Sequence, residues 1–260
     1  MIDQFQIDAI TQDVYYELAK SNCTPLLVAV YGSHHYGFPS EDSDYDIRVI
    51  HVADTKDLFR FAKPKSPLMW QGTNTDYKSY EVEQALELLF KNNPTMLEIM
   101  TARNLIQDSS EMHKIREAGF DAISKRAAPP YLGRAEHDHK KYIADNNPIY
   151  YDKHVKKYLY IFNSLLIGER LLNTGIIEPD INKHIETLPQ HLATPINWLI
   201  HKKQQRDYEI PQGDYARLND VYHKLLQRFT VAEHKSVLKE EPHNFTVFDD
   251  LLKEIRMAYL

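Results

Sequence analysis

The sequence is short of the residues and runs that mark several protein classes. Its 260 residues include a single cysteine, Cys23, which cannot form an internal disulfide and therefore agrees with a reducing compartment. No apolar stretch approaches the roughly 18 residues of a membrane-spanning helix. Residues 1–20 have the pattern of an acidic amphipathic helix, with Ile7, Ile10, Val14 and Leu18 on one face, rather than that of a signal peptide. We therefore expect a cytoplasmic protein without a membrane partner.

Two phosphate-binding signatures and an excess of positive charge are also missing. The chain contains neither Gly-x-x-x-x-Gly-Lys-Ser/Thr nor Gly-x-Gly-x-x-Gly, which argues against a P-loop ATPase and a dinucleotide-binding Rossmann module. The formal charge is -6, and residues 1–128 carry 13 Lys and Arg against 19 Asp and Glu. This balance disfavours broad, nonspecific nucleic-acid binding, although it leaves room for a local basic stripe that guides a tRNA end or a short strand.

What the chain does have is a sizeable apolar fraction, 43% of its residues, and a change of pattern near Pro129 and Pro130. Before this point helix and strand signals alternate, which predicts an α/β (α+β) fold with a small mixed sheet backed by helices over residues 1–128. After it strand signals almost vanish, so residues 129–260 are predicted to form a helical domain. The helices expected there span residues 131–145, 152–173, 181–186, 194–206, 214–230 and 247–259.

The most informative stretch lies between two apolar runs, residues 26–31 and 47–52, that are predicted to be strands. Gly32 and Ser33 follow the first run as a turn, and Asp44 and Asp46 lead into the second. If strand geometry already holds at Asp44, the two-residue period places both carboxylates on one face, about 6 to 7 Å apart. Oxygen donors at that spacing suit a hard divalent cation such as Mg2+ or Mn2+.

Arg48 continues the same face and supplies a guanidinium that binds phosphate through two hydrogen bonds. The alternative for the Asp-x-Asp pair is a solvated turn, since Gly, Ser and Asp are common loop residues. A calcium-binding EF-hand loop does not fit: counting from Asp42, Ile47 stands where glycine is needed and Ala53 where glutamate is needed. The joint pattern of strand, Gly-Ser, spacer, Asp-x-Asp and strand favours metal-assisted phosphoryl chemistry.

These residues resemble the nucleotidyltransferases of the DNA polymerase beta superfamily, and within it the group associated with RNA ligases. The resemblance implies a metal-dependent enzyme that transfers a nucleoside monophosphate from a nucleoside triphosphate such as ATP to a hydroxyl acceptor and releases pyrophosphate. It assigns metal binding to the aspartates, and triphosphate binding to Gly32, Ser33, Ser43 and Arg48. The matching positions are Gly32, Ser33, Tyr36, Gly37, Phe38, Ser43, Asp44, Asp46 and Arg48.

The resemblance also implies a third acid on a neighbouring strand. Asp76 is the preferred candidate as a catalytic and metal-binding residue, and Glu81 is the second. Glu81 stands where a helix begins, so it also suits a first-turn charge that complements the helix dipole. The stretch 75–80 that carries Asp76 is polar and fits either a strand or a surface loop.

In the second half a lysine-rich helix resembles a stretch of the same family. Lys157 is assigned to nucleotide binding on this basis, while Lys153 fits a solvated charged face. The chain departs from the family at Asn163, where an arginine is usual, and Arg170 is a candidate replacement one turn later. His34 likewise stands where the family has a basic residue.

Two other interpretations remain. His137, Asp138 and His139 suggest a metal-dependent phosphohydrolase, but the spacing to His154, His184 and His201 specifies no metal site. The second interpretation is a non-catalytic nucleotide- or partner-binding module on the same fold, such as the regulatory half of a toxin pair. The sequence leaves open whether the acceptor is an RNA end, a protein hydroxyl or a small molecule, and it does not reveal the oligomeric state.

Overall fold

The computed structural model describes residues 3–144 and 148–260. The chain divides into two compact units. The first contains residues 1–32, 44–122 and 242–260, and the second contains residues 33–43 and 123–241. The sequence predicted a division between residues 128 and 129. In the structure, residues 33–43 instead belong to the helical unit, and the C-terminal helix belongs to the unit that contains the sheet.

The first unit is built on a mixed five-stranded sheet, which confirms the predicted fold class. Its strand order is β3-β4-β2-β1-β5; β2 and β4 run parallel, and the other neighbouring pairs are antiparallel. The apolar, β-branched runs form the two central strands, and the polar stretch around Asp76 is a strand as well. The strands are β1 (Cys23–Tyr31), β2 (Tyr45–Ala53), β3 (Leu68–Gly72), β4 (Thr75–Glu81) and β5 (Leu105–Asp108).

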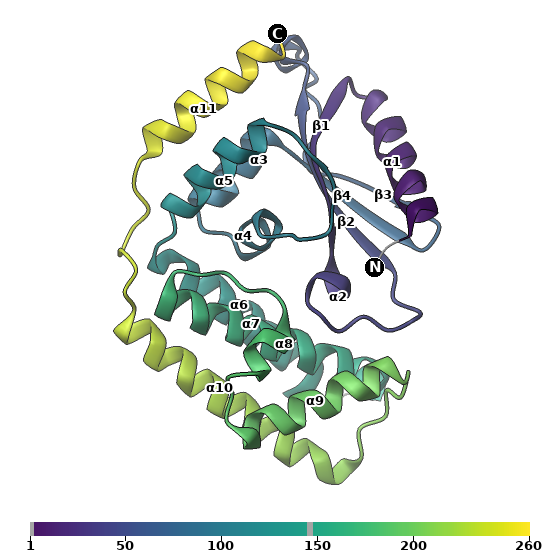
Figure 1. The fold of residues 1–260 in the computed structure, drawn as a ribbon, viewed down its shortest axis with the longest axis vertical. Helices are drawn as coiled ribbons and strands as arrows, with labels where there is room; N and C mark the ends of the chain where they lie inside the picture. Colours follow the sequence, from purple (N-terminus) through teal and green to yellow (C-terminus); the bar gives the residue numbers. More distant parts are fainter. Residues whose placement is uncertain (1–2, 145–147) are drawn as a thin grey trace. The chain divides into compact units, whose positions relative to one another are not determined.

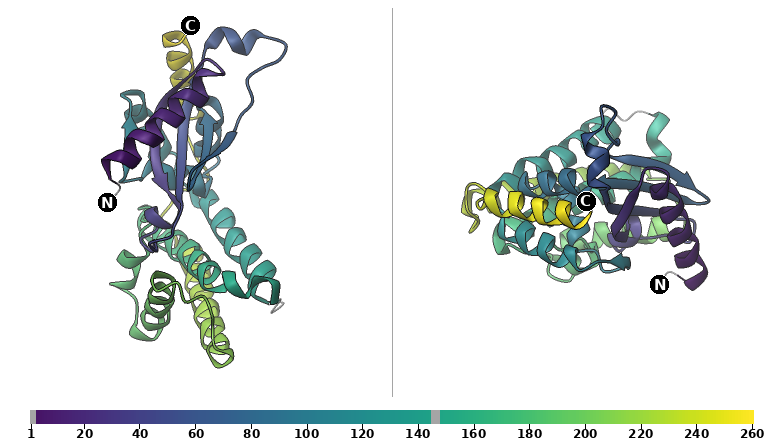
Figure 2. Two further views of the ribbon diagram at one scale, coloured as in Figure 1. Left: turned by 90° about the vertical axis from the view of Figure 1, so that its right-hand side faces the viewer. Right: turned by 90° about the horizontal axis from the view of Figure 1, so that it is seen from above.

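One face of the sheet is covered by α1 (Gln4–Ala19) (Figures 1 and 2). The predicted apolar face of this helix is confirmed at Ile10, Val14 and Leu18, which are fully buried, and Ile7 is partly buried. Asp3 begins the helix, because its side chain accepts a hydrogen bond from the Gln6 amide at 2.8 Å. These side chains pack with residues of the three central strands, including Val28, Val30, Ile47, Val49 and Tyr77.

Helices also lie on the other side of the sheet (Figures 1 and 2). Here α11 packs on α3 and α5, and Phe90 meets Phe245 and Phe248 edge to face at 5.3 and 5.4 Å between ring centres. The C-terminal helix thus belongs to the same core as the sheet. The helices are α3 (Val82–Phe90), α4 (Pro94–Met100), α5 (Glu111–Asp121) and α11 (Phe245–Ala258).

The second unit is helical, as the sequence predicts. The long helix α7 (His154–Thr174) forms its centre and packs against the other long helices, with Leu159, Phe162 and Leu171 fully buried. The other helices are α6 (Ala128–Asp138), α8 (Ile181–Ile185), α9 (Gln190–Gln204) and α10 (Tyr215–Lys235). Within the described residues, no helix is both long and apolar enough to cross a membrane.

Helix α6 differs from its predicted extent. The two prolines expected to separate domains, Pro129 and Pro130, lie in its first turn, where proline is tolerated because those amides need no intrahelical partner. The chain continues from α6 as a wider helical turn over His139–Ala144. The expected end of this helix at Asp145 lies outside the described residues.

Candidate functional site

The parallel pair β2–β4 brings two of the predicted acids to facing positions. Asp46 and Asp76 are register partners, and so are the next outward-facing residues, Arg48 and Lys78. All four are partly buried, whereas the residues between them, such as Ile47 and Tyr77, are buried in the core under α1. Neighbouring strands lie about 4.8 Å apart, so Asp46 and Asp76 lie side by side on the sheet. Arg48 and Lys78 form the next pair on the same face, two residues further along each strand.

Gly32 makes room for the first of these carboxylates. It follows β1 directly, and its neighbour Tyr31 is the register partner of Asp46 on β2. The backbone of Gly32 has a φ of +62°, and a Cβ placed there would overlap the Asp46 carboxylate. Only glycine avoids both penalties, the left-handed backbone and the steric overlap. The predicted Gly-Ser turn is the start of a short helix, α2 (Gly32–His35), and its first residue lets the Asp46 carboxylate lie against the backbone.

The Arg48 guanidinium lies beside both the Asp46 carboxylate and the Tyr31 ring. Arg48 Nη2 lies 3.2 Å from Asp46 Oδ1, and the guanidinium lies 5.1 Å from the centre of the Tyr31 ring. The Tyr31 hydroxyl in turn donates to Glu98 Oε2 at 2.5 Å, and Glu98 is fully buried. No role was predicted for Glu98 from the sequence, although Leu97 and Glu98 belong to a second stretch that resembles the family and Glu98 stands in an otherwise apolar run, Met96 to Met100.

Asp76 and Asp44 have different surroundings. Asp76 Oδ1 accepts a hydrogen bond from Gln71 Nε2 at 3.0 Å across the β3–β4 pair. Asp44 precedes β2, which begins at Tyr45, so the strand geometry required for its predicted alignment with Asp46 does not extend to it. Over residues 3–144 and 148–260, no three His, Cys, Asp or Glu side chains are grouped as a metal-binding cluster. The metal-binding roles of Asp44, Asp46 and Asp76 stay predictions.

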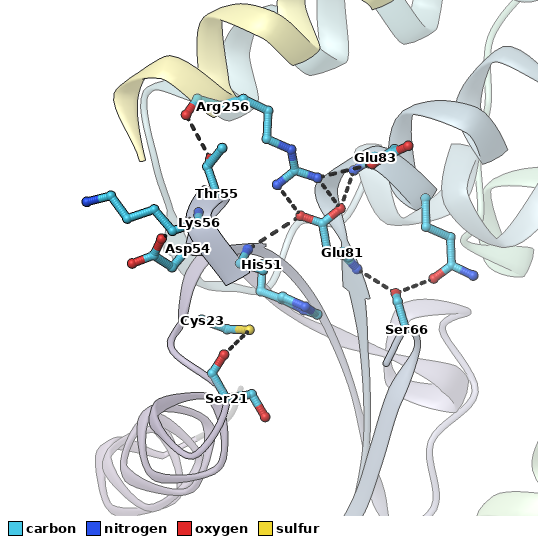
Figure 3. Close-up of polar contacts among 12 residues, drawn as sticks. Ser21, Cys23, His51, Asp54, Thr55, Lys56, Ser66, Glu81, Glu83 and Arg256 are labelled. Atoms are coloured by element: carbon cyan, nitrogen blue, oxygen red, sulfur yellow. Dashed lines mark hydrogen bonds and ion pairs between the residues drawn. The ribbon is translucent and has the colours of Figure 1, made fainter. Parts of the chain in front are cut away.

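Glu81, the alternative third acid, lies at the opposite end of β4, where both of its carboxylate oxygens accept hydrogen bonds (Figure 3). Its carboxylate accepts two hydrogen bonds from Arg256 of α11, at 2.6 and 2.8 Å, and one from the Glu83 amide at 2.8 Å. The last of these caps α3, as expected for an acid at the start of a helix. This arrangement gives Glu81 a structural role and leaves Asp76 as the acid that faces Asp46.

His51, the register partner of Glu81, belongs to the same buried cluster. Its Nδ1 lies 2.6 Å from the Ser79 hydroxyl. Burial lowers the pKa of His51 to about 4, with the Glu81 carboxylate opposing this shift and Arg256 adding to it. The ring is therefore neutral at physiological pH.

Ser33 and Ser43, both predicted to bind the triphosphate, belong to the second unit. They are the first and last residues of the segment 33–43, which lies between β1 and β2 in the chain. Ser33 is buried, and its carbonyl accepts from the Phe38 amide at 3.1 Å. Ser43 closes a turn with Ser40: the Ser43 hydroxyl accepts from the Ser40 amide at 2.9 Å. Lys203 of α9 donates to both hydroxyls, at 3.1 and 3.0 Å, although it is only 2% exposed.

Lys203 was missed by sequence analysis. Together with Lys202 it stands in the last turn of α9, where basic residues are common because they complement the helix dipole. Both lysines are buried, and only the fold reveals that Lys203 contacts the turn that precedes Asp44 in the chain. The neighbouring Arg206 holds Glu41 of the same turn at 2.8 Å.

Lys157, also in the second unit, is paired within its own helical surroundings. Its Nζ lies 3.2 Å from Asp138 Oδ2 and 3.9 Å from the centre of the Tyr142 ring. Lys153 is exposed, consistent with a solvated face. Arg170, the candidate replacement for the family's arginine, lines a surface cavity of this unit together with Arg228 and His184. The nucleotide-binding role of Lys157 stays a prediction.

The histidines proposed for a phosphohydrolase have other partners. His139 stacks on Tyr222 with 3.9 Å between ring centres, His154 contacts the Tyr215 hydroxyl at 2.9 Å, and His184 contacts the Glu178 carbonyl at 2.7 Å. Asp138 is paired with Lys157. In the described part of the chain these side chains form no metal-binding group.

Comparison with known proteins identifies the family of the chain. The model of the RNA repair pathway DNA polymerase beta family matches residues 9–254. The chain belongs to this family. The polymerase beta family therefore spans both compact units, and it supports a nucleotidyltransferase-like function.

A curated relative of this polymerase beta family member is the uncharacterized protein YcgL of Bacillus subtilis (strain 168). The two are 25% identical over 174 residues, which cover 60% of this chain and 65% of YcgL. The matched region thus spans a little under two thirds of the relative.

Proposed function

We propose that the protein is a metal-dependent nucleotidyltransferase that transfers a nucleoside monophosphate from a nucleoside triphosphate to a hydroxyl acceptor. The acceptor oxygen forms a bond to the α-phosphorus, the bond between the α-phosphorus and the bridging oxygen breaks, and pyrophosphate leaves. The observation that carries the proposal is the register pairing of Asp46 with Asp76, with Asp46 lying against the Gly32 backbone. Family membership supports the same reaction class.

The donor set near Gly32 fits a hard divalent cation. Asp46 and Asp76 offer carboxylate oxygens side by side, and Asp44 is the third proposed ligand; this chemistry suits Mg2+ or Mn2+. When bound, such an ion neutralises charge on the phosphates and polarises the phosphorus under attack. Asp76 has a further proposed role, accepting the proton of the acceptor hydroxyl.

Several groups are proposed to hold the triphosphate. Gly32 and Ser33 offer the backbone at the start of α2, Ser43 a hydroxyl, and Arg48 a guanidinium that binds two phosphate oxygens. Lys78 joins this set because it is the register partner of Arg48 on the same face of the sheet. The proposed nucleotide-binding residue of the helical unit is Lys157. Most of the rate acceleration comes from positioning and charge stabilisation, since phosphoryl-type transfer leaves little covalent work for the protein.

An RNA end is the acceptor that the family description favours, because the family is named for an RNA repair pathway. The net charge of -6 agrees with recognition of a short terminus rather than a long duplex. A protein hydroxyl and a small molecule are the competing acceptors. The cytoplasm remains the proposed compartment.

Release of pyrophosphate tests the proposal. Purified protein is incubated with each α-labelled nucleoside triphosphate, Mg2+ or Mn2+, and RNA ends, a protein acceptor or small alcohols. Metal-dependent release of pyrophosphate together with a labelled acceptor is expected. Saturable triphosphate binding without release under every condition would instead establish the non-catalytic binding module.

A further inference from the structure

A small, largely enclosed cavity lies wholly within the second unit. Its volume is about 50 Å³, and residues of α6, α7 and the segment around Tyr36 line it. Since roughly 10 to 15 Å³ of such space holds one water molecule, the cavity admits a few waters or one edge of a planar ring. Its lining also includes Asp138, the partner of Lys157.

Asn163 lines this cavity and carries a buried acceptor atom. The side chain is 2% exposed, and its Nδ2 donates to the Pro179 carbonyl at 2.9 Å. Because a carbonyl oxygen can only accept, this bond fixes the amide nitrogen toward Pro179 and turns Oδ1 away from it. Within residues 3–144 and 148–260, Asn163 Oδ1 is buried and has no hydrogen-bond partner. Buried polar atoms are nearly always satisfied, so this one indicates a donor supplied from outside the chain.

Arg134 places a cationic donor group in the same cavity. Its Nε donates to the Ser164 hydroxyl at 3.1 Å, and that hydroxyl donates to the Tyr131 carbonyl at 2.9 Å. The guanidinium also lies 5.3 Å from the centre of the Tyr131 ring. Both contacts fix the plane of the guanidinium, so a ligand in the cavity meets a donor group of set orientation.

Two aromatic rings complete the walls. Tyr36 and Tyr160 meet edge to face with 5.5 Å between ring centres, and both line the cavity. Rigid aromatic walls with one orphan acceptor and one guanidinium suit a flat heterocycle whose edge carries a donor next to an acceptor.

We propose that this cavity binds the amino edge of a nucleobase. The exocyclic amino group donates to Asn163 Oδ1, and the neighbouring ring nitrogen accepts from Arg134. Adenine and cytosine share this edge, whereas hypoxanthine and uracil carry a carbonyl oxygen where the amino group stands. The choice of a nucleotide as ligand rests on the proposed function; the base preference and the residues that impose it go beyond it.

The test compares nucleotides that differ at this one position. Equilibrium binding is measured without divalent cations, so that no turnover occurs, for ATP against inosine triphosphate and for CTP against UTP. The amino-bearing nucleotide of at least one pair is expected to bind about tenfold or more tightly, because its carbonyl analogue faces Asn163 Oδ1 with a second acceptor. The pair that shows the preference distinguishes adenine from cytosine.

Asn163→Leu is expected to abolish the preference, and Asn173→Leu is its matched control. Asn173 lies on the same helix but is exposed, so its replacement should leave the preference unchanged. A preference that survives Asn163→Leu overturns the proposal.

Because Asn163→Leu also loses the bond to Pro179, a second measurement uses the unaltered protein. The side-chain amide signals of Asn163, assigned through their proximity to Pro179, are followed by NMR during titration. ATP or CTP should shift these signals, and the carbonyl analogue should not. Equal shifts, or none, mean that the cavity holds water only and overturn the proposal.

The outcomes separate this inference from the proposed function. If no triphosphate yields pyrophosphate but the amino-bearing nucleotide still binds selectively through Asn163, the base site stands and the transfer reaction fails. If pyrophosphate is released at equal rates from ATP, inosine triphosphate, CTP and UTP, the reaction stands and the base site fails.

Discussion

Each end of the β2–β4 pair carries carboxylate side chains, but their surroundings differ. At one end Asp46 faces Asp76, both partly exposed, with Arg48 at 3.2 Å as a cation near the first. At the other end Glu81 faces His51, both buried, and Arg256 binds the Glu81 carboxylate through two hydrogen bonds. Carboxylates on register-paired residues offer oxygen ligands to a cation, whereas the buried Glu81 carboxylate already has Arg256 as its counterion.

The difference separates chemistry from stability along one pair of strands. A carboxylate that is already bound by arginine and by a helix amide has little capacity left for a metal ion, so Glu81 serves the fold. Asp46 and Asp76 are only partly buried, and the Arg48 guanidinium lies 3.2 Å from the Asp46 carboxylate, so this end of the strand pair is suited to bind a ligand. Substitutions at the two ends should therefore affect different measurements.

The largest effect is expected from the acids near Gly32. Asp46→Asn and Asp76→Asn should each lower metal-dependent pyrophosphate release by at least about a hundredfold, because several kcal/mol of charge stabilisation is lost and each 1.4 kcal/mol is a factor of ten. Asp44→Asn is expected to behave in the same way. Steady-state kinetics over a range of Mg2+ concentrations measures the loss.

Stability provides the control for these three variants. Their urea unfolding midpoints should stay near that of the unaltered protein, since the replaced groups are partly exposed and amides fill the same space. Full metal-dependent activity in both Asp44→Asn and Asp46→Asn would show that the proposed site is wrong. Loss of activity in Glu81→Gln at unchanged stability would reverse the assignment of Asp76 and Glu81.

At the opposite end, Arg256→Met should act mainly on stability. It leaves the Glu81 carboxylate buried without its cation, and breaking such a pair costs about 3 to 5 kcal/mol. Arg126→Met is the matched control, because Arg126 and its partner Glu241 are largely exposed and such a pair contributes about 0 to 1 kcal/mol. Urea denaturation measures both. Similar losses in the two variants would mean that Glu81 and Arg256 do not form a buried pair.

The pH dependence of stability sharpens the comparison further. Burial gives His51 a folded-state pKa of about 4, below its ordinary value of 6.5, so between these pH values the unfolded chain binds a proton that the folded protein does not bind. Its contribution is present above pH 6.5 and is lost as the pH falls toward 4, by roughly 3 kcal/mol. Unfolding free energies measured from pH 8 to 4 should fall less steeply in His51→Leu. A slope identical to that of the unaltered protein would contradict the buried, neutral ring.

The elements of the fold could be predicted from the sequence where a segment has a clear apolar periodicity. Strong apolar runs predicted β1 and β2, and helical spacing predicted the buried face of α1. Strand β3 was missed because its residues, LMWQG, follow Pro67 and are only partly buried, so they show neither a continuous apolar run nor a clear alternation. Local pattern also could not show that α11, from the far end of the chain, completes the core of the sheet.

The site was predictable where it depends on local spacing and not where it depends on register. The sequence placed Asp46 and Arg48 on one face of a strand, but the pairing of Asp46 with Asp76 requires the parallel alignment of β2 and β4, between which the chain forms β3. No role was predicted for Lys78 or Lys203 for the same reason, since the position of each becomes informative only beside a residue distant in the chain. Asn163 was recorded as a departure from the family pattern, whereas the structure reveals a buried acceptor.

The smallest expected effect tests the contact between the turn and Asp46. Gly32→Ala and Gly175→Ala both place a side chain at a positive φ, +62° and +73°, and each should cost about 1 to 2 kcal/mol of stability for the left-handed backbone. At Gly175 the nearest atom to a new Cβ is 3.7 Å away, so nothing else changes. At Gly32 the new Cβ would overlap the Asp46 carboxylate. Gly32→Ala should therefore lose activity as well, while Gly175→Ala keeps it. Equal activity in the two variants would show that the position of the Asp46 carboxylate against Gly32 does not matter for the reaction.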